Sequence, residues 1–125
     1  MTTILSLGPL LFNWDAEEKR DFYFRIADEA PLDTVYVGEV VCSKRSSFFD
    51  PYIPEVAERL RRGGKRVVHS TLALIMSERE MDAVRDLAGV ADMTVEANDI
   101  ATTALLAGRP HVIGPFVNVY NEGTL

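Results

Sequence analysis

The lone cysteine of the chain, Cys42, lies just before two cations, Lys44 and Arg45, in the stretch GEVVCSKR. Nearby cations favour the thiolate form of a cysteine, which is the form that attacks a substrate or binds a metal. The bland alternative is a small buried hydrophobic residue, the commonest role of a free cysteine. Because the residues after Cys42 are polar, we expect the thiol near a loop, and both interpretations stay open.

Two carboxylates follow predicted strands and are candidate catalytic groups. Glu39 comes after the apolar residues 34–37, and Glu96 holds the matching place after a later strand. Two carboxylates at the carboxyl-terminal edge of one parallel sheet, the mouth of the expected fold, can act as acid and base when their surroundings separate their pKa values. The alternative is that each carboxylate pairs with a neighbouring cation, such as Arg45. The sequence therefore makes both residues candidates without deciding between these roles.

The other polar residues at strand ends give weaker signals. Ser70 and Asn118 follow two further predicted strands, and we expect them to line the same mouth. His69 lies near that edge, so a nucleophilic pair of Cys42 and His69 is conceivable, but no third orienting group is evident. No spacing of His, Cys and Asp forms a complete metal site. His111 begins a strand, so we expect it on the opposite, structural side.

These residues are positioned by strands and helices that alternate along the chain. The helix at residues 15–29 is expected to bury Phe22, Ile26 and Ala30, and the next helix has an apolar face at i, i+3, i+4 and i+7. Asp50-Pro51 reads as the start of that second helix, and Ser77 and Glu80 have capping-box spacing. The expected strands are residues 4–12, 34–37, 65–69, 92–95 and 111–113, and the further helices end near residues 62, 88 and 107.

This alternation predicts an α/β fold with parallel strands and right-handed crossovers. Two architectures fit: an open doubly wound sheet, or the N-terminal half of a TIM-like (β/α)8 barrel, since a complete barrel needs about 250 residues. The first strand–helix turn has neither GxGxxG nor GxxxxGK[ST], which argues against a nucleotide site. We expect residues 1–125 to form a single domain.

Composition limits the partners. The net charge of −6 argues against a nucleic-acid surface, which usually needs a basic stripe. The basic cluster at residues 59–66 is read as cations at a helix C-terminus. No apolar run reaches the length of a membrane span, and the start lacks the features of a signal peptide. One cysteine cannot form an internal disulfide, so we expect a reducing, cytoplasmic setting.

Five stretches together resemble a known family, in order and at compatible spacing. They are SLGPLLFNW, VYVGEVVCSKR, STLAL, VEANDI and NVYNEGTL, at residues 6–14, 35–45, 70–74, 95–100 and 118–125. The chain is similar to the UbiV-like branch of the collagenase-like peptidase U family of (β/α) barrel proteins. The most specific piece is GE-x-VCSKR, because relatives that hydroxylate RNA carry an aromatic-Ser-x-Arg pattern there.

The resemblance implies an iron–sulfur protein of oxygen-independent ubiquinone biosynthesis. Such proteins hold a [4Fe–4S] cluster on four cysteines, of which the first matches Cys42 and the others lie in a second half that this chain lacks. They form a heterodimer with a UbiU-like paralogue, assisted by a lipid-binding accessory protein. Together these proteins hydroxylate the ring of ubiquinone precursors, with prephenate as the implicated oxygen donor.

On this interpretation the chain is a truncated half-barrel that is inactive and holds no cluster by itself. Glu39 and Glu96 are the expected catalytic groups, and the charges of Lys44 and Arg45 suit an acidic substrate that Ser70 and Asn118 also contact. Three alternatives stay open. They are an RNA hydroxylase of the same family, a non-catalytic half-barrel that pairs through its open edges, and a protease, for which we expect no cleavage.

Overall fold

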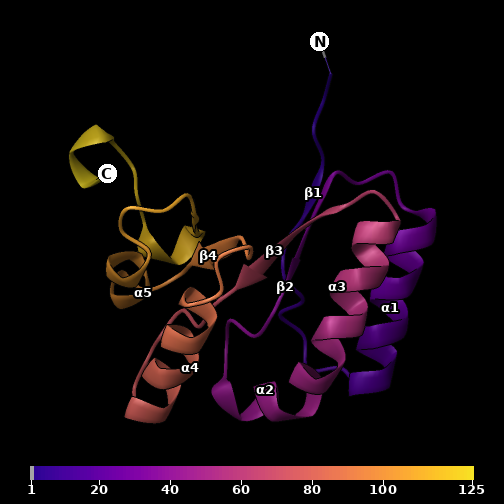
Figure 1. Cartoon of the computed structure of the whole chain (residues 1–125), viewed down its shortest axis with the longest axis horizontal. Helices are drawn as coiled ribbons and strands as arrows, with labels where there is room; N and C mark the ends of the chain where they lie inside the picture. Colours follow the sequence, from indigo (N-terminus) through magenta and orange to yellow (C-terminus); the bar gives the residue numbers. More distant parts are fainter. Residues whose placement is uncertain (1) are drawn as a thin grey trace.

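The computed structural model describes residues 2–125, which form one parallel sheet and a layer of helices (Figure 1). The strands are β1 (Ser6–Leu7), β2 (Thr34–Val37), β3 (Arg66–Ser70), β4 (Val95–Ala97) and β5 (Val112–Ile113). The helices are α1 (Ala16–Glu29), α2 (Ser43–Phe49), α3 (Ile53–Arg62), α4 (Glu78–Ala88) and α5 (Ile100–Leu105). Short 3₁₀ turns at Asp50–Tyr52, Pro115–Val117 and Glu122–Thr124 complete the chain.

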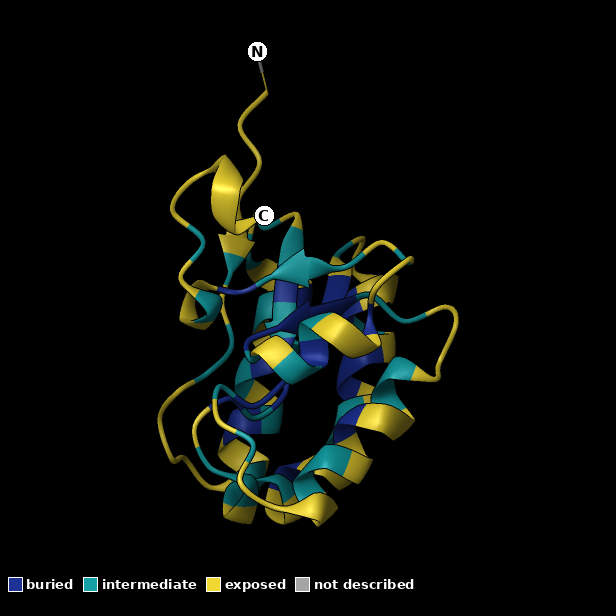
Figure 2. Ribbon diagram, turned by 90° about the vertical axis from the view of Figure 1, so that its left-hand side faces the viewer, coloured by how far each residue is buried: buried dark blue, intermediate teal, exposed yellow. Residues whose placement is uncertain are grey.

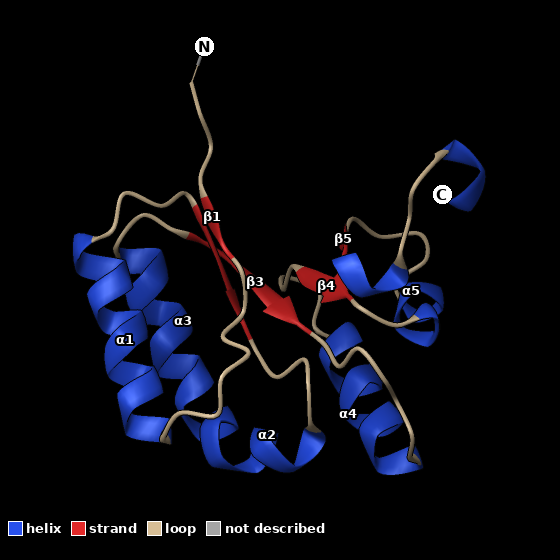
Figure 3. Cartoon of the chain, turned by 180° about the vertical axis from the view of Figure 1, so that it is seen from behind, coloured by secondary structure: helices blue, strands red, loops and turns tan. Residues whose placement is uncertain are grey.

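The strands pair in the order β1-β2-β3-β4-β5, and every pair is parallel. A doubly wound sheet reverses its strand order part-way, which sends helices to both faces. Here the order never reverses, so right-handed crossovers return every helix to the same face. The sheet curls into half of a (β/α) barrel, with helices outside and strands inside (Figure 3). The expected α/β half-barrel is confirmed, and the doubly wound alternative is excluded.

The main hydrophobic core lies between β2, β3 and the pair of helices α1 and α3 (Figure 2). Val35, Val37 and Val67 point from the strands toward Val56 and Leu60 of α3, and all five are at most 5 % exposed. The pattern at residues 53–60 therefore predicted the correct face of α3. A separate small cluster of Val95, Ala97 and Leu106 joins β4 to α5.

Helix α1 is rotated relative to the face expected from its sequence. Its buried residues are Lys19, Tyr23 and Ala27, whereas Phe22 and Ile26 are only partly buried. The hydroxyl of Tyr23 donates a hydrogen bond of 3.0 Å to the carbonyl of Tyr36 in β2. Tyr23 is fully buried on this face, and Lys19, one turn earlier, is buried with it because the two residues are four positions apart.

The element boundaries differ from the expected ones at several places. The expected fourth strand at residues 92–95 is instead Val95–Ala97, so Glu96 lies within β4 rather than after it. Residues 43–49 form helix α2, although their polar SKRSS sequence gave no apolar period. The first strand shortens to two residues because Gly8-Pro9 interrupts the pairing.

The cap of α4 was predicted correctly, since Ser77 and Glu80 form a reciprocal capping box. The expected start at Asp50-Pro51 was wrong, because these residues form a 3₁₀ turn and α3 begins at Ile53. None of the helices between residues 2 and 125 has the length and apolar composition that a membrane span requires.

Gly38 fixes the path of the chain at the end of β2. Its φ of 128° is a backbone conformation that residues other than glycine rarely adopt. A Cβ there would lie 2.5 Å from the carbonyl oxygen of Ser70. The turn after β2 can therefore pass directly against the end of β3. This close approach brings the GEVVCSKR segment to the carboxyl-terminal edge of the sheet.

We predict that Gly38→Ala lowers the free energy of unfolding by about 3 kcal/mol, from unfavourable φ and a steric clash. The matched control is Gly108→Ala, since Gly108 also has positive φ (83°) but has no atom within 4 Å of its added Cβ. The control should cost only about 1 kcal/mol. Urea denaturation of both variants measures the difference, and equal losses would show that the contact with Ser70 is unimportant.

Candidate functional site

The pleat of the sheet sends neighbouring residues to opposite faces. Ser70 is paired with Glu96, and both lie on the inner face of the half-barrel, together with Tyr36. Val37 and His69 are paired on the outer face, toward the helices. Burial, and secondarily the negative charge of Glu96, raise the pKa of Tyr36 above its ordinary value. The inner face therefore carries the polar groups that can meet a ligand at the mouth, the edge where the parallel strands end.

A buried hydrogen-bond network holds Glu96 in place. Its Oε2 accepts a bond of 2.6 Å from Ser70 Oγ and one of 3.1 Å from Asn98 Nδ2. Thr71 Oγ1 donates to the backbone carbonyl of Glu96 at 2.7 Å and accepts from the backbone N–H of Asn98 at 3.3 Å. Glu96 is 5 % exposed. Its second oxygen, Oε1, makes no hydrogen bond within residues 2–125, so one oxygen is fixed while the other is available to a ligand.

Glu39, the other candidate catalytic carboxylate, has a different task. Its Oε1 accepts hydrogen bonds from the backbone N–H groups of Val41 and Cys42, at 2.8 and 3.0 Å. It follows Val37 by two residues and Gly38 by one, so it lies toward the helix layer rather than on the inner face with Glu96. The carboxylate of Glu39 shapes the loop that carries Cys42.

In the CSKR segment, residues 42–45, Ser43 and Arg45 are held by hydrogen bonds, whereas Cys42 is partly exposed and Lys44 is exposed. Cys42 is the N-cap residue of α2 and is partly exposed. Ser43 Oγ donates a hydrogen bond of 2.5 Å to Glu80 at the start of α4, and this bond is the main cause that lowers the pKa of Glu80. Arg45 donates a bond of 3.2 Å to the carbonyl of Leu11. Lys44 is exposed to solvent.

Asn118 lies apart from the Glu96 network. It adopts the left-handed conformation, with φ of 57° and ψ of 49°, after the 3₁₀ turn that follows β5. Its side chain donates to the carbonyl of Phe116 and accepts from the hydroxyl of Tyr120, at 3.3 and 3.1 Å. Asn118 is exposed. The structure therefore brings Ser70 and Glu96 together and places Asn118 in a separate local turn.

His69 lies in the helix-facing layer and is 5 % exposed. It borders a cavity of about 280 Å³ between α3 and α4, whose lining does not include Cys42. Its Nε2 is buried without a hydrogen-bond partner in residues 2–125. Burial, with a smaller effect of the Arg61 charge, lowers the pKa of His69 to about 4. No hydrogen bond joins His69 to Cys42 within the described residues, so the nucleophilic pair of these two residues gains no support.

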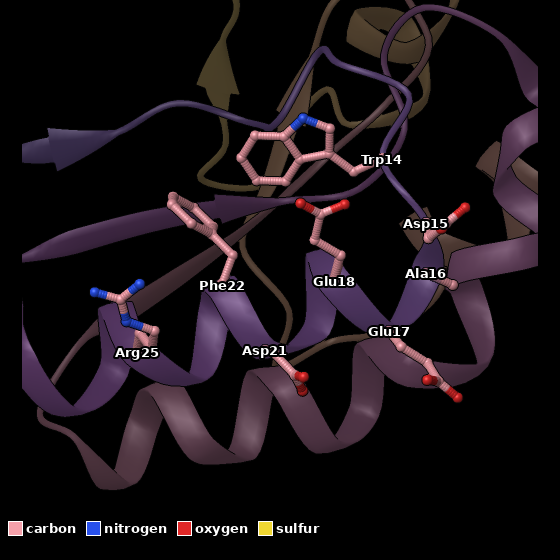
Figure 4. A pocket seen from close by; sticks show the side chains of 8 residues that line it. All are labelled: Trp14, Asp15, Ala16, Glu17, Glu18, Asp21, Phe22 and Arg25. Carbon is pink, nitrogen blue, oxygen red and sulfur yellow. The ribbon is translucent and has the colours of Figure 1, made fainter.

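The largest surface hollow follows the outer side of α1 (Figure 4). Trp14 stacks edge-on against Phe22 there, with ring centroids 5.3 Å apart. The carboxylates of Glu17, Glu18 and Asp21 spread along the helix without converging on one point. Acidic residues near the first turn complement the helix dipole. This hollow is a solvated helix face, and it carries no candidate chemistry.

Cys42 is the one cysteine of the chain that could serve as a cluster ligand. A [4Fe–4S] cluster takes four cysteine ligands, and the sequence contains one. Among residues 2–125, no three His, Cys, Asp or Glu side chains group closely enough to hold a metal ion. The residues of this chain therefore do not fit a cluster by themselves. Cys42 can supply one ligand at most.

Sequence reasoning missed Lys19, the most deeply buried cation of the described chain, which is 5 % exposed. The available signal was its position four residues before Tyr23 and eight before Ala27, on one face of α1. A lysine in a helix rich in charged residues is expected to face solvent, so the sequence did not predict that Lys19 is buried. Thr71 and Asn98 were expected as polar strand-end residues, but their role in holding Glu96 depends on contacts that only the fold creates.

Comparison with known proteins adds no assignment: no family model matches the chain, and no solved structure matches it significantly.

We predict that Glu96→Ala lowers the free energy of unfolding by about 3 kcal/mol, because the buried Ser70 hydroxyl loses its acceptor and Asn98 Nδ2 keeps only its bond to the Thr71 carbonyl. Glu96→Gln keeps an oxygen that can accept both bonds, so it should cost about 1 kcal/mol or less. Chemical denaturation of the two variants gives the comparison. Equal losses would contradict the role of this acceptor.

His69 should make the stability pH-dependent. Its pKa falls from 6.5 in the unfolded chain to about 4 in the fold, so between these values the unfolded state binds more protons. Stability then rises with pH through this window and is lost as pH falls from 7 to 4, by about 3 kcal/mol from this residue.

His69→Val should remove that part of the acid sensitivity, as measured by urea denaturation at a series of pH values. His111→Gln is the matched control, because His111 is partly exposed and its Nδ1 lies 2.8 Å from the carbonyl oxygen of Arg109. An unchanged pH profile in His69→Val would contradict the buried neutral imidazole.

Proposed function

We propose that this half-barrel is the N-terminal half of a UbiV-like iron–sulfur protein, which acts in oxygen-independent ubiquinone biosynthesis. The observation that carries the proposal is the position of Cys42. The thiol follows β2 at the mouth of the half-barrel, is partly exposed, and stands outside both hydrophobic clusters. The bland role of a buried hydrophobic cysteine is therefore poorly supported, and a ligand role is compatible with the fold.

Cys42 is held in a defined place by the residues around it. Its backbone N–H bonds Glu39, and the next residue, Ser43, is tethered to Glu80 of α4. Groups fixed at the carboxyl ends of parallel strands are well suited to sites, because several loops converge there. Such anchoring is what a metal ligand needs, since ligand geometry must be kept within narrow limits.

The remaining cluster ligands come from outside these residues, in the full-length protein. The proposed partners are a UbiU-like paralogue, which forms a heterodimer with it, and a lipid-binding accessory protein. The reaction is hydroxylation of the ring of a ubiquinone precursor, with prephenate as oxygen donor. Within this proposal, Glu96 is the residue best placed for proton transfer, since one of its oxygens is fixed and the other is unbonded.

The charged residues beside Cys42 suit an acidic substrate. Lys44 is exposed, and Arg45 donates one hydrogen bond to the Leu11 carbonyl. Its other donors stay available for a carboxylate, because guanidinium offers five N–H groups. Glu39 is committed to its own loop, so we assign it a positioning role rather than a catalytic one. Ser70 holds Glu96, and Asn118 contributes to a separate turn.

The open sheet favours a second candidate, a non-catalytic interaction module. Within the described residues, β1 pairs only with β2, and β5 pairs only with β4. Unpaired edges of parallel strands are templates for another chain. Ile4 and Leu5, next to β1, are 74 % and 46 % exposed. On this alternative, Cys42 has no role beyond capping α2.

The two candidates differ in the effect of Cys42→Ala. The complete gene product that contains these residues is expressed, with its UbiU-like paralogue, in an anaerobically grown bacterium that lacks its own UbiV-like protein. We predict that the parent restores ubiquinone, whereas Cys42→Ala reduces ubiquinone by more than about tenfold, because one of four cluster ligands is lost. Mass spectrometry of lipid extracts measures the ubiquinone content.

Ser47→Ala is the matched control, because Ser47 is an exposed residue of α2 whose only hydrogen bond is a long one, 3.4 Å, to the Lys44 carbonyl. It should leave ubiquinone synthesis unchanged. Anaerobic reconstitution with iron and sulfide should give the broad visible absorbance of an iron–sulfur cluster in the parent but not in Cys42→Ala. A Cys42→Ala product with full activity would exclude the cluster role and favour the interaction module.

A further inference from the structure

A second cavity, of about 330 Å³, lies between the start of α1, the loop before it, and α2. It is separate from the inner-face network around Glu96. Two cations, Lys19 and Arg45, border the cavity, and the carboxylates of Asp15 and Glu39 are also at its walls. The rest of the wall is mostly aromatic: Phe12, Trp14, Phe48, Phe49 and Tyr52.

Lys19 is a buried cation that lacks a partner. It is 5 % exposed, and among residues 2–125 its Nζ forms no ion pair and no hydrogen bond, although the Nζ atom itself is not fully closed off from the cavity. The Nζ instead lies 4.8 Å from the centre of the Phe49 ring. A cation–aromatic contact offsets only part of the cost of removing an ammonium group from water. The cavity beside Lys19 is where a compensating negative charge would fit.

The nearest carboxylates supply only part of that charge: Glu39 and Asp50 act on Lys19 through space, but neither forms an ion pair with it. Glu39 directs its Oε1 to the backbone N–H groups of Val41 and Cys42. Asp15 is exposed, and its side chain forms no capping hydrogen bond with α1. Burial lowers the pKa of Lys19, and the charge of Glu39 acts in the opposite direction but is outweighed.

The first turn of α1 adds further donors. The side chain of its N-cap residue, Asp15, forms no hydrogen bond with the backbone N–H groups of this turn. Uncapped N–H groups at a helix N-terminus attract anions. Arg45 lies on the opposite wall and has donors beyond its bond to the Leu11 carbonyl. An anion next to Lys19 would thus be reached by positive groups from both α1 and α2.

The aromatic walls specify the rest of the ligand. Phe49 is buried and stacks on Tyr52, with ring centroids 6.2 Å apart. Phe12 and Phe48 are 71 % and 73 % exposed, so large apolar side chains stand at the rim without covering. A flat ring would find stacking partners between them. A small inorganic anion would leave this aromatic surface unused.

We propose that this cavity binds a small carboxylate carried on a planar ring. The carboxylate pairs with the Lys19 ammonium, with Arg45 as a second donor, and the ring packs against the aromatic walls. The inference shares Arg45 with the acidic-substrate contact of the proposed function, but none of its contacts uses the Cys42 thiol. Binding is therefore expected to persist in Cys42→Ala, so failure of either proposal leaves the other standing.

The test uses the fluorescence of Trp14, which is the single tryptophan of the chain and borders the cavity. Titration with benzoate should change this fluorescence saturably. Benzamide, which has the same shape without the charge, and acetate, which has the charge without the ring, should each bind at least about tenfold more weakly. Benzamide or acetate binding as tightly as benzoate would overturn the proposal.

Two variants locate the binding site. Lys19→Met should weaken benzoate binding by about tenfold or more, because a charge-assisted bond is lost. The matched control, Arg25→Met, removes an exposed cation from the same helix and should leave the affinity unchanged. Equal affinity in Lys19→Met and the parent, or equal losses in both variants, would contradict the assignment.

Phe48→Ala keeps the test decisive if Lys19→Met fails to fold, since Phe48 is 73 % exposed and contributes little to the core. Truncating this rim residue should weaken benzoate several-fold while leaving acetate unaffected, because only the ring loses contact. Circular dichroism confirms that the variant is folded. A folded Phe48→Ala protein with parental benzoate affinity would place the ring elsewhere and overturn the proposal.

Discussion

The sequential parallel pairing of β1 to β5 is the constraint on which the rest of the structure depends. Because every crossover is right-handed and the order never reverses, all helices cover one face of the sheet. The other face is left for polar groups, and all strands end at one mouth. The hydrogen bond between Ser70 and Glu96 exists only because β3 and β4 are neighbours in this order. A reversed strand order would separate these two residues.

The two faces of the sheet treat polar groups differently. On the inner face, Glu96 is surrounded by donors, so its burial is offset by hydrogen bonds. On the helix side, His69 Nε2 is buried without a partner, and Lys19 is 5 % exposed without an ion pair among residues 2–125. His69 responds by staying neutral, since burial lowers its pKa to about 4. Lys19 instead borders an open cavity, where a ligand can supply the missing charge.

Local signals in the sequence predicted the helices and their ends better than the helix faces. The Ser77–Glu80 capping box and the apolar spacing of α3 depend on residues a few positions apart, so they can be read without the fold. The prediction of the buried face of α1 was wrong, because packing against β2 and α3 buries Lys19, Tyr23 and Ala27 instead. The polar α2 was missed, since its stability depends on tethers such as Ser43 to Glu80.

The sequence by itself determined the α/β class, the parallel order implied by alternating elements, and the position of Cys42 after the second strand. These properties follow from hydrophobic period and chain connectivity, which are local. Only the tertiary structure decided that Glu96 joins Ser70 while Glu39 turns to its own loop, and that Lys19 is buried beside an aromatic cavity. Those outcomes depend on strand parity and on contacts between residues far apart in the chain, which no local pattern encodes.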